Sequence, residues 1–481
     1  DNFEIVTIIE KLKKAGLLYL VVQKFSEINL GADTIDNLEM GYMFEELIRK
    51  FSEQSNETAG EHFTPREVIE LMVEVLLDTD LDEITTTDGK VITILDPACG
   101  TGGMLSIAQN KIRALNSRTT VVPFGQELNP ETYATCKSDM ILKNNTNSKI
   151  VFGNSFSEDG FREQKFDYIL SNPPFGVEWK KVKNFIENES KHKGYDGRFG
   201  AGTPRISDGS LLFLQHMISK MQPIEKGGSR IGIVFNGSPL FSGDAGSGES
   251  EIRKWIIEKD LLEAVIGLPD QLFYNTGIST YVWILTNRKT DRRKGKIRLI
   301  NGTSFFGKMR KSLGNKRNEI TESDRKEIVR LYSTYEHDEN YIDFDNDDFG
   351  YRKITIERPL YDENREVVVE KGNPKPNSKL RDTETVPFKE DIHEYFKREA
   401  AETVFEKAGK KITPKLLLEA IRTLPEEKRK AVLLYYFEGM NDTEIAELFD
   451  TSRSTIQYRR TSSFEKLRKY LEENADEWDE W

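Results

Sequence analysis

Two stretches of the sequence carry residues suited to holding a nucleoside. Residues 94–105 read ILDPACGTGGML, an apolar strand pattern that runs into three glycines and then into a helical pattern. Glycines let the backbone turn tightly and approach a ligand, and a helix N-terminus offers N–H groups. The next strand pattern ends at Glu127, where a carboxylate can bind both hydroxyls of a ribose. No Lys-Ser/Thr follows the glycines, which excludes a P-loop. The glycine loop and Glu127 together predict a site for an adenosine derivative. The alternative is a βα turn that binds no ligand.

A third strand pattern, FDYILS (166–171), ends abruptly in Asn172, Pro173, Pro174 and Phe175. Two consecutive prolines cannot continue a sheet, because they remove backbone donors and fix the backbone dihedral angles. The strand therefore places an asparagine, a rigid diproline and an exposed aromatic at one point. The alternative is a plain strand terminator followed by a core phenylalanine.

The composition limits the classes of partner. The 481 residues carry a net charge of −12, so a contact with nucleic acid must be local or must depend on a partner. Two cysteines and no CxxC pair fit a reducing cytoplasm and exclude a zinc ribbon, and no metal site is expected. No apolar run reaches the ~18 residues of a membrane span. The first residue is Asp1, which suggests a fragment or a processed form.

The chain is organised in four parts. Residues 1–60 are expected to be helical. Residues 61–290 alternate helical stretches, among them 102–115 and 210–221, with seven strand patterns, which indicates a doubly wound α/β sheet. Residues 291–400 form an extension that is basic and poor in strands at first, then Asp-rich, with a linker or long loop at 370–379. Residues 401–481 are expected to form a C-terminal domain whose pattern is purely helical from about residue 413. The seven strands are expected at 91–96, 121–127, 149–153, 166–171, 230–235, 263–268 and 280–286.

The motifs, taken in order, resemble those of the N6-adenine methyltransferases of DNA. They are GEHFTPREV (60–68), LDPACGTGG (95–103), GQELN (125–129), GNSF (153–156) and SNPPFG (171–176). Within that group the chain looks like the modification subunit of a type I restriction–modification system, over roughly residues 1–398. The resemblance implies a seven-stranded, Rossmann-like methyltransferase sheet that uses S-adenosyl-L-methionine. It implies as partners DNA and a separate specificity subunit, and leaves open whether a restriction (translocase) subunit joins. By this resemblance, the family's N-terminal helical domain is expected to be shortened here.

The resemblance assigns chemistry to the strand end at 172–175. The exocyclic amine of adenine is a poor nucleophile, and two acceptors on its hydrogens pull the nitrogen toward a tetrahedral geometry. The Asn172 side-chain oxygen and the Pro173 carbonyl can supply them, with the carbonyl held by Pro174 as a preorganised dipole. Phe175 can stack on the base, which must first leave the duplex.

The resemblance also assigns the cofactor site. Phe63, Thr64 and Pro65 would lie beside the methionine end and the adenine, although Thr64 is equally placed to cap a helix that has Pro65 at its first position. Asn154 or Ser155 would contact the cofactor adenine, and Cys99 is expected to be structural. The loop 197–210 is expected to be too polar for the core, and it either closes over the base or moves. The expected cofactor-binding residues are Glu61, His62, Phe63, Thr64, Pro65, Arg66, Asp96, Pro97, Gly100, Thr101, Gly102, Gly103, Glu127 and Asn154.

Residues 424–471 resemble region four of sigma-70-type factors. A short helix from Asp442 is followed by a three-residue turn and a longer helix, which is a helix-turn-helix pattern. Residues 453–469 hold six Lys or Arg against one Glu, a basic stripe inside an acidic chain. A helical hairpin for packing or protein contacts is the alternative. The expected DNA-binding residues are Arg453, Ser454, Gln457, Tyr458, Arg459 and Arg460.

Three functions stay open at this point. The first is an adenine-specific DNA methyltransferase subunit. The second is a methyltransferase of protein or RNA, since both use close variants of the Asn-Pro-Pro-Phe motif. The third is a transcription regulator with an inactive methyltransferase fold.

Overall fold

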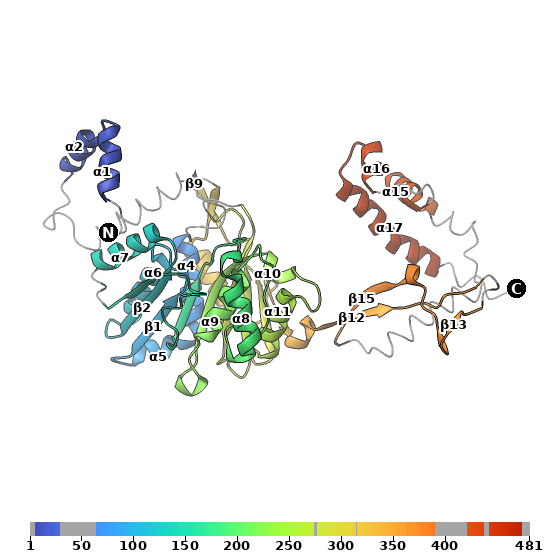
Figure 1. Cartoon of the computed structure of the whole chain (residues 1–481), viewed down its shortest axis with the longest axis horizontal. Helices are drawn as coiled ribbons and strands as arrows, with labels where there is room; N and C mark the ends of the chain where they lie inside the picture. Colours follow the sequence, from blue (N-terminus) through green and yellow to red (C-terminus); the bar gives the residue numbers. More distant parts are fainter. Residues whose placement is uncertain are drawn as a thin grey trace. The chain divides into compact units, whose positions relative to one another are not determined.

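The computed structural model describes residues 5–28, 64–143, 145, 147–273, 277–313, 315–362, 364, 366–389, 421–436 and 442–473. The chain divides into two compact units, Asp1–Lys389 and Glu390–Trp481, and each is described by itself (Figure 1). The expected helical pattern near residues 37–51 lies outside the described residues. In the part of the chain that is described, no helix is both long and apolar enough to cross a membrane.

Nine strands of the first unit form one mixed sheet. Their bounds are β1 Val91–Asp96, β2 Thr120–Glu127, β3 Lys149–Phe152, β4 Tyr168–Ser171, β5 Arg230–Asn236, β6 Leu262–Gly267, β7 Thr280–Thr286, β8 Lys296–Asn301 and β11 Tyr341–Asp345. The order across the sheet is β11-β8-β6-β7-β5-β4-β1-β2-β3. The strands β7 and β11 run antiparallel to their neighbours, and the remaining neighbours are parallel.

All seven expected strands are present, and the doubly wound α/β class is confirmed. The description of the segment after residue 288 as poor in strands is wrong, because β8 lies there and β11 lies in the Asp-rich stretch. Arg298 interrupts the apolar pattern of β8, yet it is buried and its guanidinium pairs with Asp343 of β11 at 2.7 Å. β11 is an edge strand with mostly exposed side chains. The sheet therefore continues past the boundary suggested at residue 290.

Helices cover both faces of this sheet. They are α4 Arg66–Leu77, α5 Leu81–Thr86, α6 Gly103–Leu115, α7 Pro130–Leu142, α8 Lys183–Lys193, α9 Ser210–Ser219, α10 Ser238–Phe241, α11 Gly248–Glu258 and α12 Glu322–Ser333. One apolar cluster joins Ile92 and Ile94 of β1 to α4, α6, α7 and α12. A second joins Leu95 of the same strand to α9 and α11. This alternation along β1 gives the three-layer architecture seen in Figure 1.

Smaller elements complete the first unit. Two of them are the helices α1 Ile5–Lys14 and α2 Leu18–Ser26. Three strand pairs are β9 Gly307–Leu313 with β10 Lys316–Glu319, β12 Tyr351–Ile356 with β15 Asp382–Pro387, and β13 Val369–Glu370 with β14 Asn373–Pro374. The short 3-10 helices are η1 Asp78–Asp80, η2 Lys180–Val182, η3 Gly194–Asp196, η4 Ile224–Lys226, η5 Asn346–Phe349 and η6 Ser378–Leu380. The expected linker at 370–379 thus contains part of a small hairpin.

The second unit is helical over its described residues. Its helices are α15 Glu426–Tyr436, α16 Asp442–Leu448 and α17 Arg453–Glu473. Asp450 has a φ of +47°, which turns the chain between α16 and α17. Ile445 of α16 and Ile456 of α17 are fully buried against Ala431 of α15, so the two helices of the expected helix-turn-helix share a small core.

The order of strands locates the crevice of the sheet. The chain runs from β1 outward to β2 and β3, and then returns to the other side of β1 as β4. In open α/β sheets, ligands bind outside the carboxyl ends of the strands at such a switch point. Asp96 ends β1 and Asn172 directly follows β4, so the expected site residues meet at this crevice.

Candidate functional site

Asp96 stands at the carboxyl end of β1 and is 2% exposed. Its Oδ1 accepts hydrogen bonds from the Ala98 backbone N–H at 3.0 Å and from Ser171 Oγ at 2.9 Å. The pKa of Asp96 is raised to about 7, chiefly by burial. The two hydrogen bonds act in the opposite direction and lower this pKa, whereas the charge of Glu127 raises it further. A carboxyl held this way fixes the first turn of the glycine loop.

The glycine loop needs its glycines at two positions with positive φ. Gly100 has a φ of +52°, and a Cβ there would meet no atom within 4 Å, which leaves open space beside the backbone. Gly102 has a φ of +85°, and a Cβ there would lie 2.7 Å from Cys136 Sγ. Cys99 is buried, and its neighbour Cys136 together with burial raises the pKa of the Cys99 thiol, in keeping with a structural role. Thr101 lies in the turn, and Gly103 is the first residue of α6.

Glu127 ends β2 and holds the same loop. Its Oε2 accepts from the Gly100 N–H at 2.8 Å, and its Oε1 accepts from the Asn129 N–H at 2.7 Å. The two bonds fix the plane of the carboxylate at the edge of the crevice. Each oxygen retains a second acceptor position, as two vicinal hydroxyls require.

The turn after β3 is tied to the glycine loop as well. Ser155 Oγ donates to the Pro97 carbonyl at 2.5 Å. The Asn154 side chain accepts from the backbone N–H groups of Phe156 and Ser157 at 2.9 and 3.3 Å, so its oxygen closes the turn. Sequence reasoning treated Asn154 and Ser155 as alternatives for contact with the cofactor, and both lie at the crevice.

Asn172 is held by a residue far away in sequence. Its Nδ2 donates to Thr64 Oγ1 at 2.9 Å. The expectation that Thr64 caps α4 is wrong, since Pro65 is the N-cap residue of this helix. Arg66, the first residue of α4, bonds through Nε to Glu70 at 3.1 Å. The structure thus brings Thr64 to Asn172, whereas Glu61, His62 and Phe63 lie outside the described residues.

Phe175 is not the exposed aromatic that the sequence suggested. It is 5% exposed and belongs to the large apolar cluster of the α4 face. Pro173 is buried and Pro174 is half-buried, and Gly176 turns the chain away with a φ of +63°. The diproline points the chain into the protein at once, so the ring packs inward. Stacking of Phe175 on a base remains a prediction.

The polar loop at 197–210 is anchored rather than loose. Arg198 donates to the carbonyls of Ser155 and Phe156 at 2.9 and 2.6 Å and pairs with Glu189 of α8 at 2.6 Å. Phe199 is fully buried beneath it. The expectation that this loop is too polar for the core is therefore wrong for the start of the loop. There a paired arginine and a buried phenylalanine fasten it to the turn after β3.

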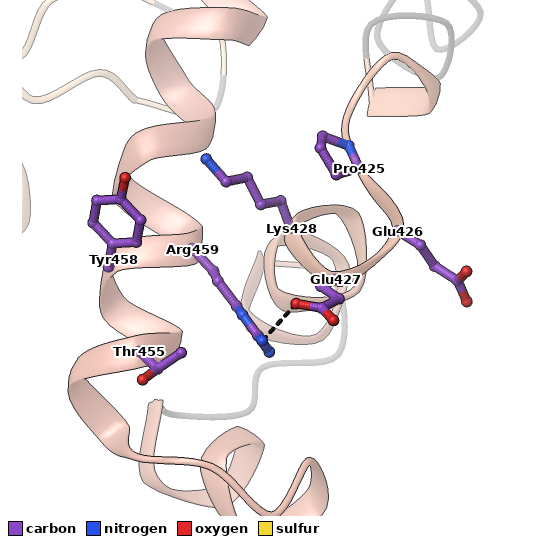
Figure 2. Close-up of a pocket in the computed structure, with 7 residues that line it drawn as sticks. All are labelled: Pro425, Glu426, Glu427, Lys428, Thr455, Tyr458 and Arg459. Atoms are coloured by element: carbon purple, nitrogen blue, oxygen red, sulfur yellow. Dashed lines mark ion pairs between the residues drawn. The ribbon is translucent and has the colours of Figure 1, made fainter.

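In the second unit, the expected DNA-binding side chains fall into two groups. Arg453, Ser454, Gln457 and Tyr458 are exposed on the first turns of α17. Figure 2 shows Arg459 pointing from α17 to Glu427 of α15, at 2.5 Å, across a cleft of about 620 Å³. Arg460 pairs with Asp442 of α16 at 3.1 Å, with both side chains largely buried. Arg460 therefore holds α16 against α17.

Comparison with known proteins identifies the family. Residues 36–350, more than half of the chain, match the model of the N-6 DNA Methylase family. The chain belongs to the N-6 DNA methylase family. Residues 415–467 match the model for Sigma-70, region 4.

The relatives of this chain include named methylase subunits. It is 29% identical over 343 residues to the type I restriction enzyme MjaIX methylase subunit of Methanocaldococcus jannaschii, covering 69% of this chain and 55% of that one. It is 31% identical over 280 residues to the HindI methylase subunit of Haemophilus influenzae, covering 57% and 55%. The chain spans about half the length of these relatives.

A solved structure shares the fold of this chain. The type I restriction–modification methyltransferase subunit from Streptococcus thermophilus superposes with a TM-score of 0.54 at 27% identity, covering 64% of this chain and 60% of that one.

Sequence reasoning missed two side chains that organise the crevice, Ser171 and Arg198, and it missed the contact of the expected residue Thr64 with Asn172. Ser171 joins the end of β4 to the end of β1, Arg198 joins the loop 197–210 to the turn after β3, and Thr64 orients Asn172. A hydroxyl directly before Asn172 and an arginine near the start of a glycine-rich loop were the available signals. Their partners lie 75, 43 and 108 residues away, and neither strand pattern nor composition predicts such contacts.

Proposed function

We propose that this chain transfers a methyl group from S-adenosyl-L-methionine to the exocyclic amine of adenine in DNA, as the modification subunit of a type I restriction–modification system. The observation that carries the proposal is the junction of β1 and β4. There the Thr64–Asn172 pair lies beside the glycine loop, and Glu127 braces that loop.

The residues of the crevice fit the cofactor. Open space at Gly100 lets the backbone meet a ligand, and the oriented Glu127 carboxylate suits a ribose. The bound cofactor supplies an activated methyl group on a sulfonium, so no metal or strong base is needed. Asp96 and Ser155 keep the loop in place from within the protein.

Asn172 and Pro173 supply the acceptors for the target amine. The bond to Thr64 holds the Asn172 amide in one orientation, and the prolines fix the Pro173 carbonyl. Accepting both N6–H groups concentrates the lone pair on nitrogen, which then forms the bond to the methyl carbon. The bound cofactor would supply this methyl group and keep the carbon–sulfur electron pair on its sulfur, and one N6 proton would pass to water.

The sequence specificity is assigned to a partner. The chain is acidic overall, and phosphate contacts, which supply most non-specific affinity for DNA, require Lys and Arg. The names of the relatives, which are methylase subunits, support a complex with a specificity subunit, which a restriction subunit can extend.

A second function is proposed for the second unit, which is binding of duplex DNA by α17. The row of exposed Arg453, Ser454, Gln457 and Tyr458 at the start of this helix supports it, since base edges are read there in helix-turn-helix proteins.

The deciding experiment is co-purification of the chain with the products of neighbouring genes, followed by transfer of labelled methyl groups to unmethylated genomic DNA. Label in N6-methyladenine that disappears with Asn172→Ala supports the proposal. Label in protein or RNA would favour the second class of methyltransferase. An intact complex that binds DNA and transfers no label would favour a regulator.

A further inference from the structure

A basic hairpin leaves the sheet at the edge where Asn172 lies. It consists of β9 and β10, which pair antiparallel and follow the carboxyl end of β8. β8 runs parallel to β6, and β6 runs parallel to β5 and β4 because β7 is antiparallel to both of its neighbours. The carboxyl ends of β8 and β4 therefore lie at one edge. Figure 1 shows β9 standing clear of the body there.

The foot of the hairpin is fixed to the catalytic side. Lys316 is 3% exposed and forms an ion pair with Glu67 in the first turn of α4. Asn318 Nδ2 donates to the Asp270 carbonyl at 2.8 Å. Glu67 is three residues along the chain from Thr64, whose hydroxyl holds Asn172. The base of the hairpin at Lys316 is thus connected to Asn172 through Glu67, one turn of backbone and Thr64.

The outer part of the hairpin is positively charged and exposed. Lys308, Arg310 and Arg317 are exposed, and none of them forms an ion pair with a described residue. Some exposed cations elsewhere in the unit have acidic partners, as Lys294 has in Asp291 at 2.7 Å, whereas others, such as Lys226, form no ion pair with a described residue. In a chain with a net charge of −12, three exposed cations without such partners form a local positive surface.

We propose that the β9–β10 hairpin binds the phosphate backbone of DNA beside the target adenine. The inference rests on the proposed function, which brings a duplex to this edge. Phosphate contacts fix the register of a protein on DNA, and three cations on a hairpin with a fixed foot can do so next to the base that leaves the duplex. The other polyanion that fits is an acidic face of a partner subunit, which the experiments below distinguish.

The first experiment measures the salt dependence of binding. The full chain, with any subunit that co-purifies, carries Lys308→Ala, Arg310→Ala and Arg317→Ala together. A control carries Arg118→Ala, Lys226→Ala and Lys294→Ala, which lie before β2, β5 and β8 at the opposite edge and change the charge equally. Fluorescence anisotropy on labelled duplex should give a log–log salt slope smaller by about 2–3 for the hairpin variant, at ~0.9 per phosphate contact. Equal slopes for both variants would overturn the proposal.

The second experiment locates the neighbour of the hairpin. Both native cysteines are buried, so Ser312→Cys places one reactive thiol on β9, and Ser117→Cys places one at the opposite edge as a control. A photoreactive azide on Ser312→Cys should cross-link to the DNA strand, whereas the control should not. A cross-link to a partner subunit in place of DNA would show that the hairpin docks protein.

The two proposals fail separately. If cross-linking and the slope change occur but wild-type complex transfers no methyl group to DNA, the hairpin assignment stands and the methyltransferase function falls. If the wild type methylates DNA and the hairpin variant keeps its KM for DNA and its salt slope, the hairpin assignment falls alone.

Discussion

Ser171 Oγ donates a 2.9 Å hydrogen bond to Asp96 Oδ1, and so joins the strand end that carries Asn172 to the strand end that carries the glycine loop. Ser171 has no exposed surface, and Asp96 has almost none. A shift of either strand end would therefore be felt at the other. Besides the pairing of β1 with β4, a buried hydroxyl therefore couples the proposed base site to the proposed cofactor site.

Ser171→Ala should weaken both sites. Removing the donor leaves a buried carboxyl with one partner fewer, which should lower the free energy of unfolding by about 1–3 kcal/mol. It should also raise the pKa of Asp96 further, because the Ser171 bond is one of the contacts that lower it. Denaturant unfolding and the pH profile of methyl transfer test this. Ser171→Thr keeps the hydroxyl, so it should keep the free energy of unfolding and the pKa of Asp96 near those of wild type. The exposed Ser117→Ala should change neither quantity. If the pH profile of Ser171→Ala is identical to that of wild type, Ser171 does not couple the two sites.

The pH dependence of stability should carry a contribution from Asp96. The folded protein holds the proton to about pH 7, whereas the unfolded chain releases it near 3.8. The stabilisation from this group is fully present below 3.8 and is lost as the pH rises through 7, at about 1.4 kcal/mol per pH unit. Unfolding curves between pH 4 and pH 8 should show this fall in wild type. The same fall in Asp96→Asn would assign it to other groups.

The sequence predicted the elements of the sheet better than the contacts of the site. Apolar runs identify buried strands, so β1 to β7 were found, while β8 escaped because a buried Arg298 paired with Asp343 reads as polar. The motif order predicted which strand ends meet. It could not predict that Thr64 bonds Asn172 rather than capping α4, or that Phe175 turns inward, because both depend on packing between distant segments.

Glu127→Ala should abolish tight cofactor binding. The variant loses the acceptors proposed for the ribose hydroxyls, each bond to a charged group contributing roughly 1.5–3 kcal/mol, and also releases the Gly100 N–H that the carboxylate holds. Calorimetry with S-adenosyl-L-methionine measures the loss, expected to exceed tenfold. Glu131→Ala, on the exposed first turn of α7, is the matched control. An unchanged affinity in Glu127→Ala would place the ribose elsewhere.

Asn172→Ala should stop methyl transfer and leave the affinity for S-adenosyl-L-methionine nearly intact, since the side chain is assigned to the base. Thr64→Val keeps the shape of the side chain but removes the hydroxyl that accepts from Asn172 Nδ2. It should lower kcat while keeping most cofactor affinity. Single-turnover kinetics and calorimetry separate the two effects. Near-normal turnover in Asn172→Ala would refute the acceptor role.

The basic residues of α17 should separate into two kinds. Arg460 is paired with Asp442 inside the second unit, so Arg460→Ala should destabilise that unit by on the order of 1–3 kcal/mol and weaken DNA binding only through unfolding.

Arg453 and Tyr458 are exposed, so Arg453→Ala with Tyr458→Ala should lower the affinity of the full chain for duplex DNA without lowering its thermal stability. Arg459 must leave Glu427 before it can reach a phosphate, and Glu427→Gln should therefore strengthen binding. Anisotropy across a salt series, read beside thermal unfolding, distinguishes the two kinds. If the Arg453 and Tyr458 variant binds as wild type does, α17 serves contacts other than DNA.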